Sequence, residues 1–254
     1  MSMSLKDKII FVTGASSGIG EACVRGFAAA GARLLIAARR RDRLDKLAAE
    51  LKVPCHCLTL DVRDRAAVEA AVAHLPAEWT SIDILLNNAG LARGIGKIYD
   101  ADQEDWDEMI DTNVKGLLYI SHAVIPGMVE RGHGHIINIG SLAGHDVYPG
   151  GSVYCSTKAS VKALTFGMRL DLHGTGIRVS SVDPGLCETE FSLVRFHGDS
   201  ERAAKAYHGV RPLTGADIAE VVLFCATRQE HVNIVDVLVT PTAQSAISLV
   251  ARKQ

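Results

Sequence analysis

Short runs rich in valine, isoleucine and leucine recur along this chain and are separated by longer segments with helical periodicity. The runs are KIIFVTG (8–14), RLLIAA (33–38), CHCLTLD (55–61), IDILLNNAG (82–90), GHIINIGS (134–141), IRVSSVDPG (177–185) and residues 234–239. Strands that are apolar on both faces are typical of parallel sheets covered by helices on both sides. We therefore expect an α/β fold of the Rossmann type, with a doubly wound parallel sheet of about seven strands.

The segments between these runs predict the helices. We expect them at 18–30, 42–51, 65–74, 105–131, from Tyr154 to about 173, and 217–226. No Ser/Pro-rich linker divides the chain, so we predict a single domain over 1–254. Residues 186–212 fall outside the alternation and follow the sixth predicted strand, at the edge where open α/β sheets bind ligands. We predict that this segment is a small substrate lid.

Composition narrows the possible partners. The chain is 48% hydrophobic and 22% charged with a net charge of −2, which does not favour a nucleic-acid partner. The apolar run in MSMSLKDKII is too short for a signal peptide or a membrane span, so we expect a cytoplasmic protein without a membrane partner. The pair Cys55 and Cys57 has no second pair at ligand spacing, so we expect no metal site.

The stretch TGASSGIG joins the first predicted strand to the first predicted helix. Glycines in that context permit a tight turn and let backbone N–H groups approach a pyrophosphate at the helix N-terminus. The alternative is a turn whose glycines serve packing alone. We predict a dinucleotide site formed by Gly14, Ser16, Ser17, Gly18, Ile19 and Gly20.

The end of the second predicted strand indicates which dinucleotide. A free ribose 2′-hydroxyl calls for an acidic residue about 20 positions beyond the glycines, and Arg39 and Arg40 stand there instead. Guanidinium groups suit a phosphate dianion, so we predict NADP(H) as the cofactor. The alternative is that these arginines are solvated charges at the start of a helix. Further contacts are expected with the adenine and the ribose, from Asp61, Val62, Asn88, Ala89 and Gly90.

Tyr154 and Lys158 lie four residues apart, which places both side chains on one face of a helix. An ammonium beside a phenol favours the phenolate, so the spacing predicts a lowered pKa for Tyr154. Such a phenol can give a proton to an alkoxide or take one from an alcohol. The alternative is a solvated helix face on which the stem of Lys158 covers the ring.

These motifs in this order resemble the short-chain dehydrogenase/reductase family over nearly the whole chain. The resemblance implies an active site of Ser141, Tyr154 and Lys158, which Asn113 supports through a water. Ser141 would donate a hydrogen bond to the substrate oxygen, and Lys158 would also hold the nicotinamide ribose. Pro184, Gly185 and Thr189 would hold the nicotinamide amide. The family also implies a homo-oligomer, a tetramer or a dimer.

Within that family, LPAEW, PGMVERGHGHIINIGS and TEFSLVRFHGD resemble the bacterial NADP-dependent 3-hydroxy acid dehydrogenases, which act on L-allo-threonine, serine and related acids. Arg195 in the predicted lid could pair with a substrate carboxylate, and Arg93 is a second candidate. Both could equally be surface residues. His145 lies in the substrate-facing stretch, where a loop histidine is more often structural than catalytic. The alternatives are another carbonyl reductase, for 3-oxoacyl, sulfo-aldehyde or general ketone substrates, and a non-catalytic NADP sensor.

Overall fold

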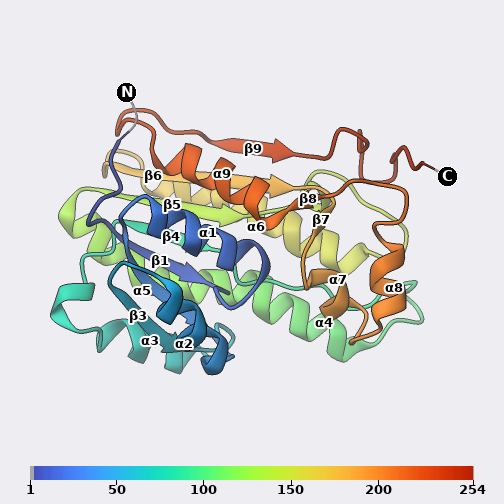
Figure 1. The fold of residues 1–254 in the computed structure, drawn as a ribbon, viewed down its shortest axis with the longest axis horizontal. Coiled ribbons are helices and arrows are strands. Elements are labelled where there is room, and N and C mark those ends of the chain that lie inside the picture. The colour runs from blue at the N-terminus through green and yellow to red at the C-terminus, as the bar shows by residue number, and fades with distance from the viewer. Residues whose placement is uncertain (1–2, 254) are drawn as a thin grey trace.

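A computed structural model describes residues 3–253, and its centre is a seven-stranded sheet in the order β3-β2-β1-β4-β5-β6-β9 (Figure 1). All neighbouring strands of this sheet are parallel, which confirms the predicted fold class. The strands are β1 (Ile9–Thr13), β2 (Arg33–Ala38), β3 (Cys55–Thr59), β4 (Ile84–Asn87), β5 (Gly134–Ile139), β6 (Ile177–Pro184) and β9 (Asp236–Val239).

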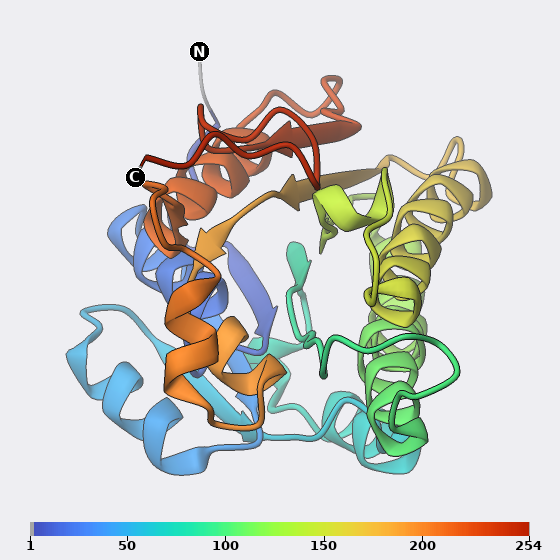
Figure 2. The same cartoon turned by 90° about the vertical axis from the view of Figure 1, so that its right-hand side faces the viewer.

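Helices cover both faces of the sheet, as Figure 2 shows from the end at which the strands finish. One face packs against α1 (Gly18–Ala29), α2 (Arg41–Glu50) and α9 (Gly215–Ala226). The other packs against α3 (Arg65–Ala73), α5 (Leu117–Arg131) and α6 (Ser152–Asp171). Successive strand residues such as Ile10 and Phe11 enter the two opposite cores, and both are fully buried. Among residues 3–253, no helix is long and apolar enough to cross a membrane.

The helix expected at 105–131 is interrupted. It consists of α4 (Gln103–Ile110), a π-helical segment (Asp111–Gly116) and α5, which Gly132 caps in the left-handed region with φ +69°. A π segment widens the helix locally and is frequent at functional sites. This one contains Asn113 and places its side chain in the protein interior.

The predicted lid segment, residues 186–212, contains two short helices and one short strand. They are β7 (Cys187–Glu188), α7 (Phe191–Arg195) and α8 (Ser200–Lys205). β7 pairs in parallel with β8 (Leu213–Thr214), and this small second sheet, absent from our prediction, closes the base of the segment. The chain after β9 runs back over the segment, where Gln244 Oε1 accepts a hydrogen bond of 2.8 Å from the Leu186 N–H.

Candidate active site

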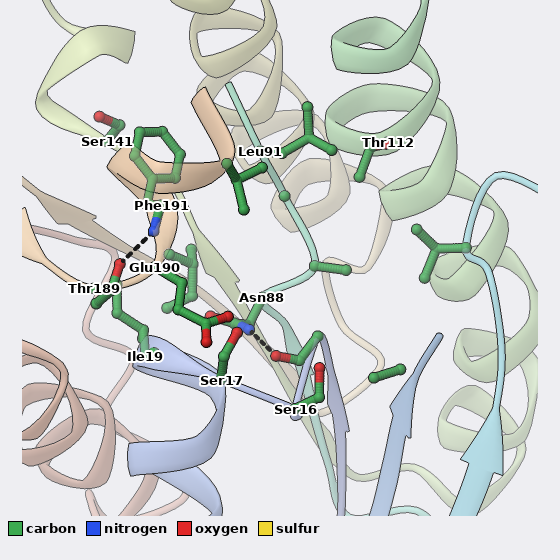
Figure 3. Close-up of a pocket in the computed structure, with 18 of the residues that line it drawn as sticks. Ser16, Ser17, Ile19, Asn88, Leu91, Thr112, Ser141, Thr189, Glu190 and Phe191 are labelled. Carbon is green, nitrogen blue, oxygen red and sulfur yellow. Dashed lines mark hydrogen bonds between the residues drawn. The ribbon is translucent and has the colours of Figure 1, made fainter. Parts of the chain in front are cut away.

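A cleft opens where the strands end, beneath the lid segment (Figure 3). Most of the residues that the sequence predicted for cofactor and substrate line this one cleft. They are Gly14, Ser16, Ser17, Gly18, Ile19, Arg39, Arg40, Asp61, Val62, Asn88, Ala89, Gly90, Ser141, Tyr154, Lys158, Pro184, Gly185 and Thr189. Gly20, Asn113 and Arg195 lie behind this wall or beside it, and each is described below.

The glycine turn has the geometry that a dinucleotide requires. Gly14 and Gly18 have φ values of +65° and +57°, which side chains rarely adopt. A Cβ at Gly20 would overlap the Gly14 carbonyl, so Gly20 serves packing and does not line the cleft as predicted. The Ser17 side chain makes no capping hydrogen bond to α1, and its Oγ accepts a hydrogen bond of 2.8 Å from Arg40. The first N–H groups of α1 therefore suit a pyrophosphate.

The two predicted arginines differ in their surroundings. Arg40 donates to Ser16 Oγ at 3.3 and 3.1 Å through Nε and Nη2, and its Nη1 lies 2.9 Å from the Glu190 carboxylate. Arg43 pairs with the same carboxylate at 2.5 Å. The side chain of Arg39 is 53% exposed and lies 3.7 Å from Glu108. The donor set around Ser16 therefore fits a phosphate dianion.

Asp61, predicted to accept a hydrogen bond from adenine, lines the cleft but is already paired. Both of its carboxylate oxygens accept hydrogen bonds from Arg63, at distances between 2.6 and 3.0 Å. Burial alone would raise the pKa of Asp61, but the hydrogen bonds from Arg63 hold this pKa below its ordinary value. The negative charge of Asp61 is therefore paired with the positive charge of Arg63.

Asn113 joins two parts of the site. Its Oδ1 accepts from the Leu91 N–H at 2.8 Å, while its Nδ2 donates to the Leu91 carbonyl at 2.8 Å and to Thr157 Oγ1 at 3.0 Å. Both N–H groups of the amide are therefore used, and the side chain fixes the loop after β4 against α6. The water that the family resemblance assigns to Asn113 stays a prediction.

The Ser141, Tyr154 and Lys158 side chains all line this cleft. Ser141 caps a 3₁₀ turn (Leu142–Gly144), and its Oγ accepts a hydrogen bond of 3.1 Å from the Ala143 N–H. Lys158 Nζ donates to the Ile139 carbonyl at 2.9 Å. Within residues 3–253, no hydrogen bond joins Lys158 to the Tyr154 phenol, although both side chains line the cleft.

Burial sets the protonation of this pair. It raises the pKa of Tyr154 to about 12, against smaller lowering effects of the Ser141 hydroxyl and the Arg195 charge. The predicted lowering of this pKa is therefore wrong for the protein alone, because removing a phenolate from water outweighs the nearby cations. Burial also lowers the pKa of Lys158 to about 8, and Asp183 opposes that effect. Near neutral pH the site holds a neutral phenol beside a protonated amine.

His145 has a structural environment. Its Nε2 contacts the buried Asp183 carboxylate, and Lys162 Nζ lies 2.7 Å from its Nδ1. Asp183 also accepts a hydrogen bond from the Ser181 hydroxyl. These contacts tie the loop after β5 to β6, which agrees with the structural reading of this histidine.

The two candidate arginines for the substrate are also distinguished by their contacts. Arg93 is engaged with the Glu108 carboxylate at 2.5 Å and with the Val194 carbonyl at 2.6 Å, so it anchors α7. Arg195 donates to the Tyr148 hydroxyl, and its guanidinium lies 5.1 Å from the centre of the Tyr154 ring. Arg195 Nε is buried without a hydrogen-bond partner in the described part of the chain. Arg195 is therefore the better candidate.

Sequence reasoning missed several residues of the cleft wall. They are Leu91, Thr112, Glu190, Phe191 and Val194. Glu190 had a detectable signal, since it is a charged residue directly after Thr189 in a segment already predicted to cover the site (Figure 3). The apolar residues carried none, because an apolar side chain in a loop or on a short helix is equally typical of ordinary packing.

A Rossmann-type sheet, a glycine turn at the start of α1 and a Ser/Tyr/Lys set in the cleft define a dinucleotide-dependent oxidoreductase. The model of the family described as short chain dehydrogenase matches residues 8–198. The chain belongs to the short-chain dehydrogenase family, which confirms the resemblance seen in its motifs.

Relatives with curated functions match almost end to end. The NADP-dependent 3-hydroxy acid dehydrogenase YdfG of Escherichia coli K12 is 49% identical over 247 residues, covering 97% of this chain and all of the relative. The sulfoacetaldehyde reductase of Chromohalobacter salexigens is 47% identical over 239 residues, covering 93% and 94%. The closed form of serine dehydrogenase complexed with NADP+ superposes with a TM-score of 0.93 at 49% identity, covering 97% of this chain and all of that one.

Proposed function

We propose that this protein is an NADP(H)-dependent oxidoreductase that interconverts a small 3-hydroxy acid and its 3-oxo acid or semialdehyde. Serine, allo-threonine and 3-hydroxypropionate are the substrate types. The observation that carries the proposal is the convergence of Ser141, Tyr154 and Lys158 in the cleft that the glycine turn borders. The similarity to a 3-hydroxy acid dehydrogenase and to serine dehydrogenase supports this substrate class.

The chain has the residues to hold NADP(H). The α1 N-terminus and the glycine turn would bind the pyrophosphate, and Ser16, Arg39 and Arg40 would bind the 2′-phosphate. Pro184, Gly185 and Thr189 would orient the nicotinamide, which supplies hydride transfer when bound. NADPH should be preferred to NADH, and Arg39→Ala should narrow the ratio of the two specificity constants. A preference for NADH in the parent enzyme would exclude this assignment.

The proton chemistry is assigned to Tyr154. Because burial keeps its phenol neutral, Tyr154 can donate a proton to the developing alkoxide during carbonyl reduction. Ser141 donates a hydrogen bond to the same substrate oxygen, and Lys158 contributes positive charge from the floor of the cleft. In alcohol oxidation the phenolate form would accept the hydroxyl proton. The positive charges around the ring favour that form.

Arg195 is our candidate for recognition of the substrate anion. Its buried, unpartnered Nε and its position beside Tyr154 suit a carboxylate carried near the reacting carbon. A guanidinium also binds a sulfonate, and the similarity to sulfoacetaldehyde reductase favours a sulfo-aldehyde as the second candidate substrate. A general ketone or 3-oxoacyl substrate would leave the charge of Arg195 unused.

One assay series separates these substrates. NADPH oxidation would be measured with malonic semialdehyde, sulfoacetaldehyde and a panel of neutral ketones, and NADP+ reduction with 3-hydroxypropionate and serine. We expect the highest kcat/KM with the carboxylate substrates, and Arg195→Gln should raise their KM more than that of the neutral ketones. Turnover of neutral ketones alone would overturn the acid specificity. Retained turnover in Tyr154→Phe would overturn the mechanism.

We also propose that the protein is a cytoplasmic homo-oligomer, a tetramer or a dimer, with residues 186–212 as its lid. Large apolar side chains exposed on α5, α6 and the edge strand β9 support an oligomer. They include Leu118, Phe166, Leu170 and Leu238, which are 37%, 54%, 59% and 47% exposed. A sedimentation experiment on the full chain would give the state directly, and a monomer would exclude this part of the proposal.

A further inference from the structure

The guanidinium of Arg195 lies within an aromatic enclosure. Its central carbon is 5.1 Å from the Tyr154 ring centre, 5.5 Å from that of Tyr148 and 5.6 Å from that of Phe191. The rings of Tyr154 and Phe191 also contact each other, with centres 5.6 Å apart. Distances of this size allow a cation to be attracted to the ring faces. The lid segment therefore delivers a positive charge directly against the proposed acid–base residue.

The position of this charge is fixed by contacts on several sides. Phe191 and Arg195 are four residues apart on α7, so they share one face of that helix. The Gly94 N–H donates to the Arg195 carbonyl at 2.8 Å, and Arg93 holds the preceding carbonyl of Val194 at 2.6 Å. The guanidinium itself donates to the Tyr148 hydroxyl. The charge is thus held where it is by α7 and its neighbours.

The charge of Arg195 is not cancelled by a counter-ion. Across residues 3–253, no carboxylate lies within ion-pair distance of its guanidinium, in contrast to Arg93, which is paired with Glu108. A cation close to a phenol stabilises the phenolate, and a half-buried site weakens screening by water. Lys158, the other cation of the cleft, donates to a backbone carbonyl and not to the phenol.

We propose that Arg195 is a positioning residue that acts on Tyr154 through its charge, so that the placement of α7 and proton transfer by Tyr154 are coupled. This inference rests on the proposed role of Tyr154 as proton donor and acceptor. In alcohol oxidation the O–H bond of the substrate breaks, and its proton forms the phenol O–H of Tyr154. Arg195 favours the phenolate that must be present before this step. In reduction the same phenol gives up its proton, and Arg195 stabilises the phenolate that results.

Other groups around Tyr154 also affect its protonation. The Ser141 hydroxyl lowers the pKa of Tyr154, while Tyr148 in the loop before α6 and Cys155 on α6 raise it. Lys158 of α6 lines the same cleft, and Asp105 of α4, which pairs with His197, lines a second pocket that Tyr154 also borders. None of these belongs to α7. A change confined to Arg195 therefore separates the contribution of the lid from that of the helix that carries Tyr154.

The test uses a neutral substrate, so that recognition of a carboxylate cannot contribute. The pH dependence of kcat/KM would be measured for oxidation of the methyl ester of 3-hydroxypropionate with NADP+, in the parent, Arg195→Gln and Arg195→Lys. Arg195→Gln should move the ascending limb of the kcat/KM–pH profile to higher pH by about one unit. At pH values below that limb, kcat/KM should be roughly tenfold lower than in the parent. Lysine should restore most of the shift. Arg202→Gln is the matched control, because Arg202 lies 4.6 Å from the Phe196 ring, away from Tyr154.

A second readout is independent of turnover. Tyrosine labelled with ¹³C at the ring ζ carbon would be titrated in the complex with NADP+, whose positive charge favours the phenolate, with the Tyr154 signal assigned by its loss in Tyr154→Phe. Arg195→Gln should move this titration to higher pH, and Arg202→Gln should leave it in place. An unchanged titration and pH profile, with a raised KM for carboxylate substrates, would make Arg195 a substrate contact only and overturn the inference. If Tyr154→Phe retains turnover, the proposed function fails instead, and the two failures are distinguishable.

Discussion

Replacing Arg40 by methionine tests whether this residue selects NADP over NAD. Arg40 lies at the start of α2 with its Nε and Nη2 directed at Ser16 and Ser17. Methionine keeps most of the length of the side chain and removes the charge. We expect a loss with NADPH and almost none with NADH, because only NADPH carries the 2′-phosphate.

The size of this loss can be worked out from the surroundings of Arg40. A charge-assisted hydrogen bond contributes about 1.5–3 kcal/mol, and the lower end applies because the Arg40 side chain is 40% exposed and screened by water. About 1.5 kcal/mol corresponds to roughly a tenfold fall in kcat/KM for NADPH. Arg39 remains beside the phosphate, so the preference should be reduced and not reversed.

The assay compares kcat/KM for NADPH and NADH at low and at physiological ionic strength. Raising the salt concentration should narrow the difference between parent and variant with NADPH, because salt screens an exposed charge. Arg41→Met is the matched control, since Arg41 is the next residue and pairs with Asp45 at 2.8 Å. An equal loss with NADPH and NADH would refute the reasoning and show that Arg40 supports the glycine turn instead.

Three further predictions concern the catalytic pair and the lid. Tyr154→Phe should lower turnover by at least about 10³-fold while the Kd of NADPH, measured by fluorescence titration, changes less than about twofold; a weakened Kd of similar size would indicate misfolding. Lys158→Met should raise the free energy of unfolding of the cofactor-free protein by about 2 kcal/mol at pH 7, as measured with urea. Folding lowers the pKa of Lys158 from 10.5 to about 8, so the folded parent protein becomes more stable as the pH rises from about 8 to 10.5. The difference in free energy of unfolding between variant and parent should therefore shrink toward pH 10. A variant less stable than the parent at pH 7 would contradict this. Glu190→Gln should weaken binding of adenosine 2′,5′-bisphosphate by about threefold in calorimetry, because Glu190 orients Arg40. The control Glu188→Gln on β7 should leave this binding unchanged. Tighter binding in Glu190→Gln would show that Glu190 competes with the phosphate for Arg40.

The five inner strands β1, β2, β4, β5 and β6 were predictable because they are buried on both faces and therefore lack polar alternation. β7 and β8 were not predictable, because two-residue strands exist only through their pairing with each other across the lid segment. The helix over 105–131 has a continuous helical pattern in the sequence. Its π segment follows from the tertiary contacts of Asn113 with the Leu91 backbone and Thr157, which no local propensity encodes.

The residues of the candidate site likewise fall into those that the sequence could predict and those that it could not. Residues whose chemistry is tied to a spacing, such as Tyr154 with Lys158 or Arg39 with Arg40, were predicted and lie in one cleft. The protonation of Tyr154 was predicted in the wrong direction, because four-residue spacing shows which side chains share a face and says nothing about burial. Tyr154 is buried, so desolvation decides the pKa of its phenol.

The two ends of α7 make contacts with different parts of the candidate site. Glu190 precedes the helix and pairs with Arg40 and Arg43 on the cofactor side, while Arg195 ends the helix against Tyr154. Because α7 is only five residues long, we expect a shift that breaks one contact to disturb the other. Glu190→Gln and Arg195→Gln should therefore be non-additive in kcat/KM for a neutral substrate, with a coupling energy of at least about 0.5 kcal/mol. Additive effects would mean that the two ends of the lid act independently, since distant, unlinked substitutions add within that margin.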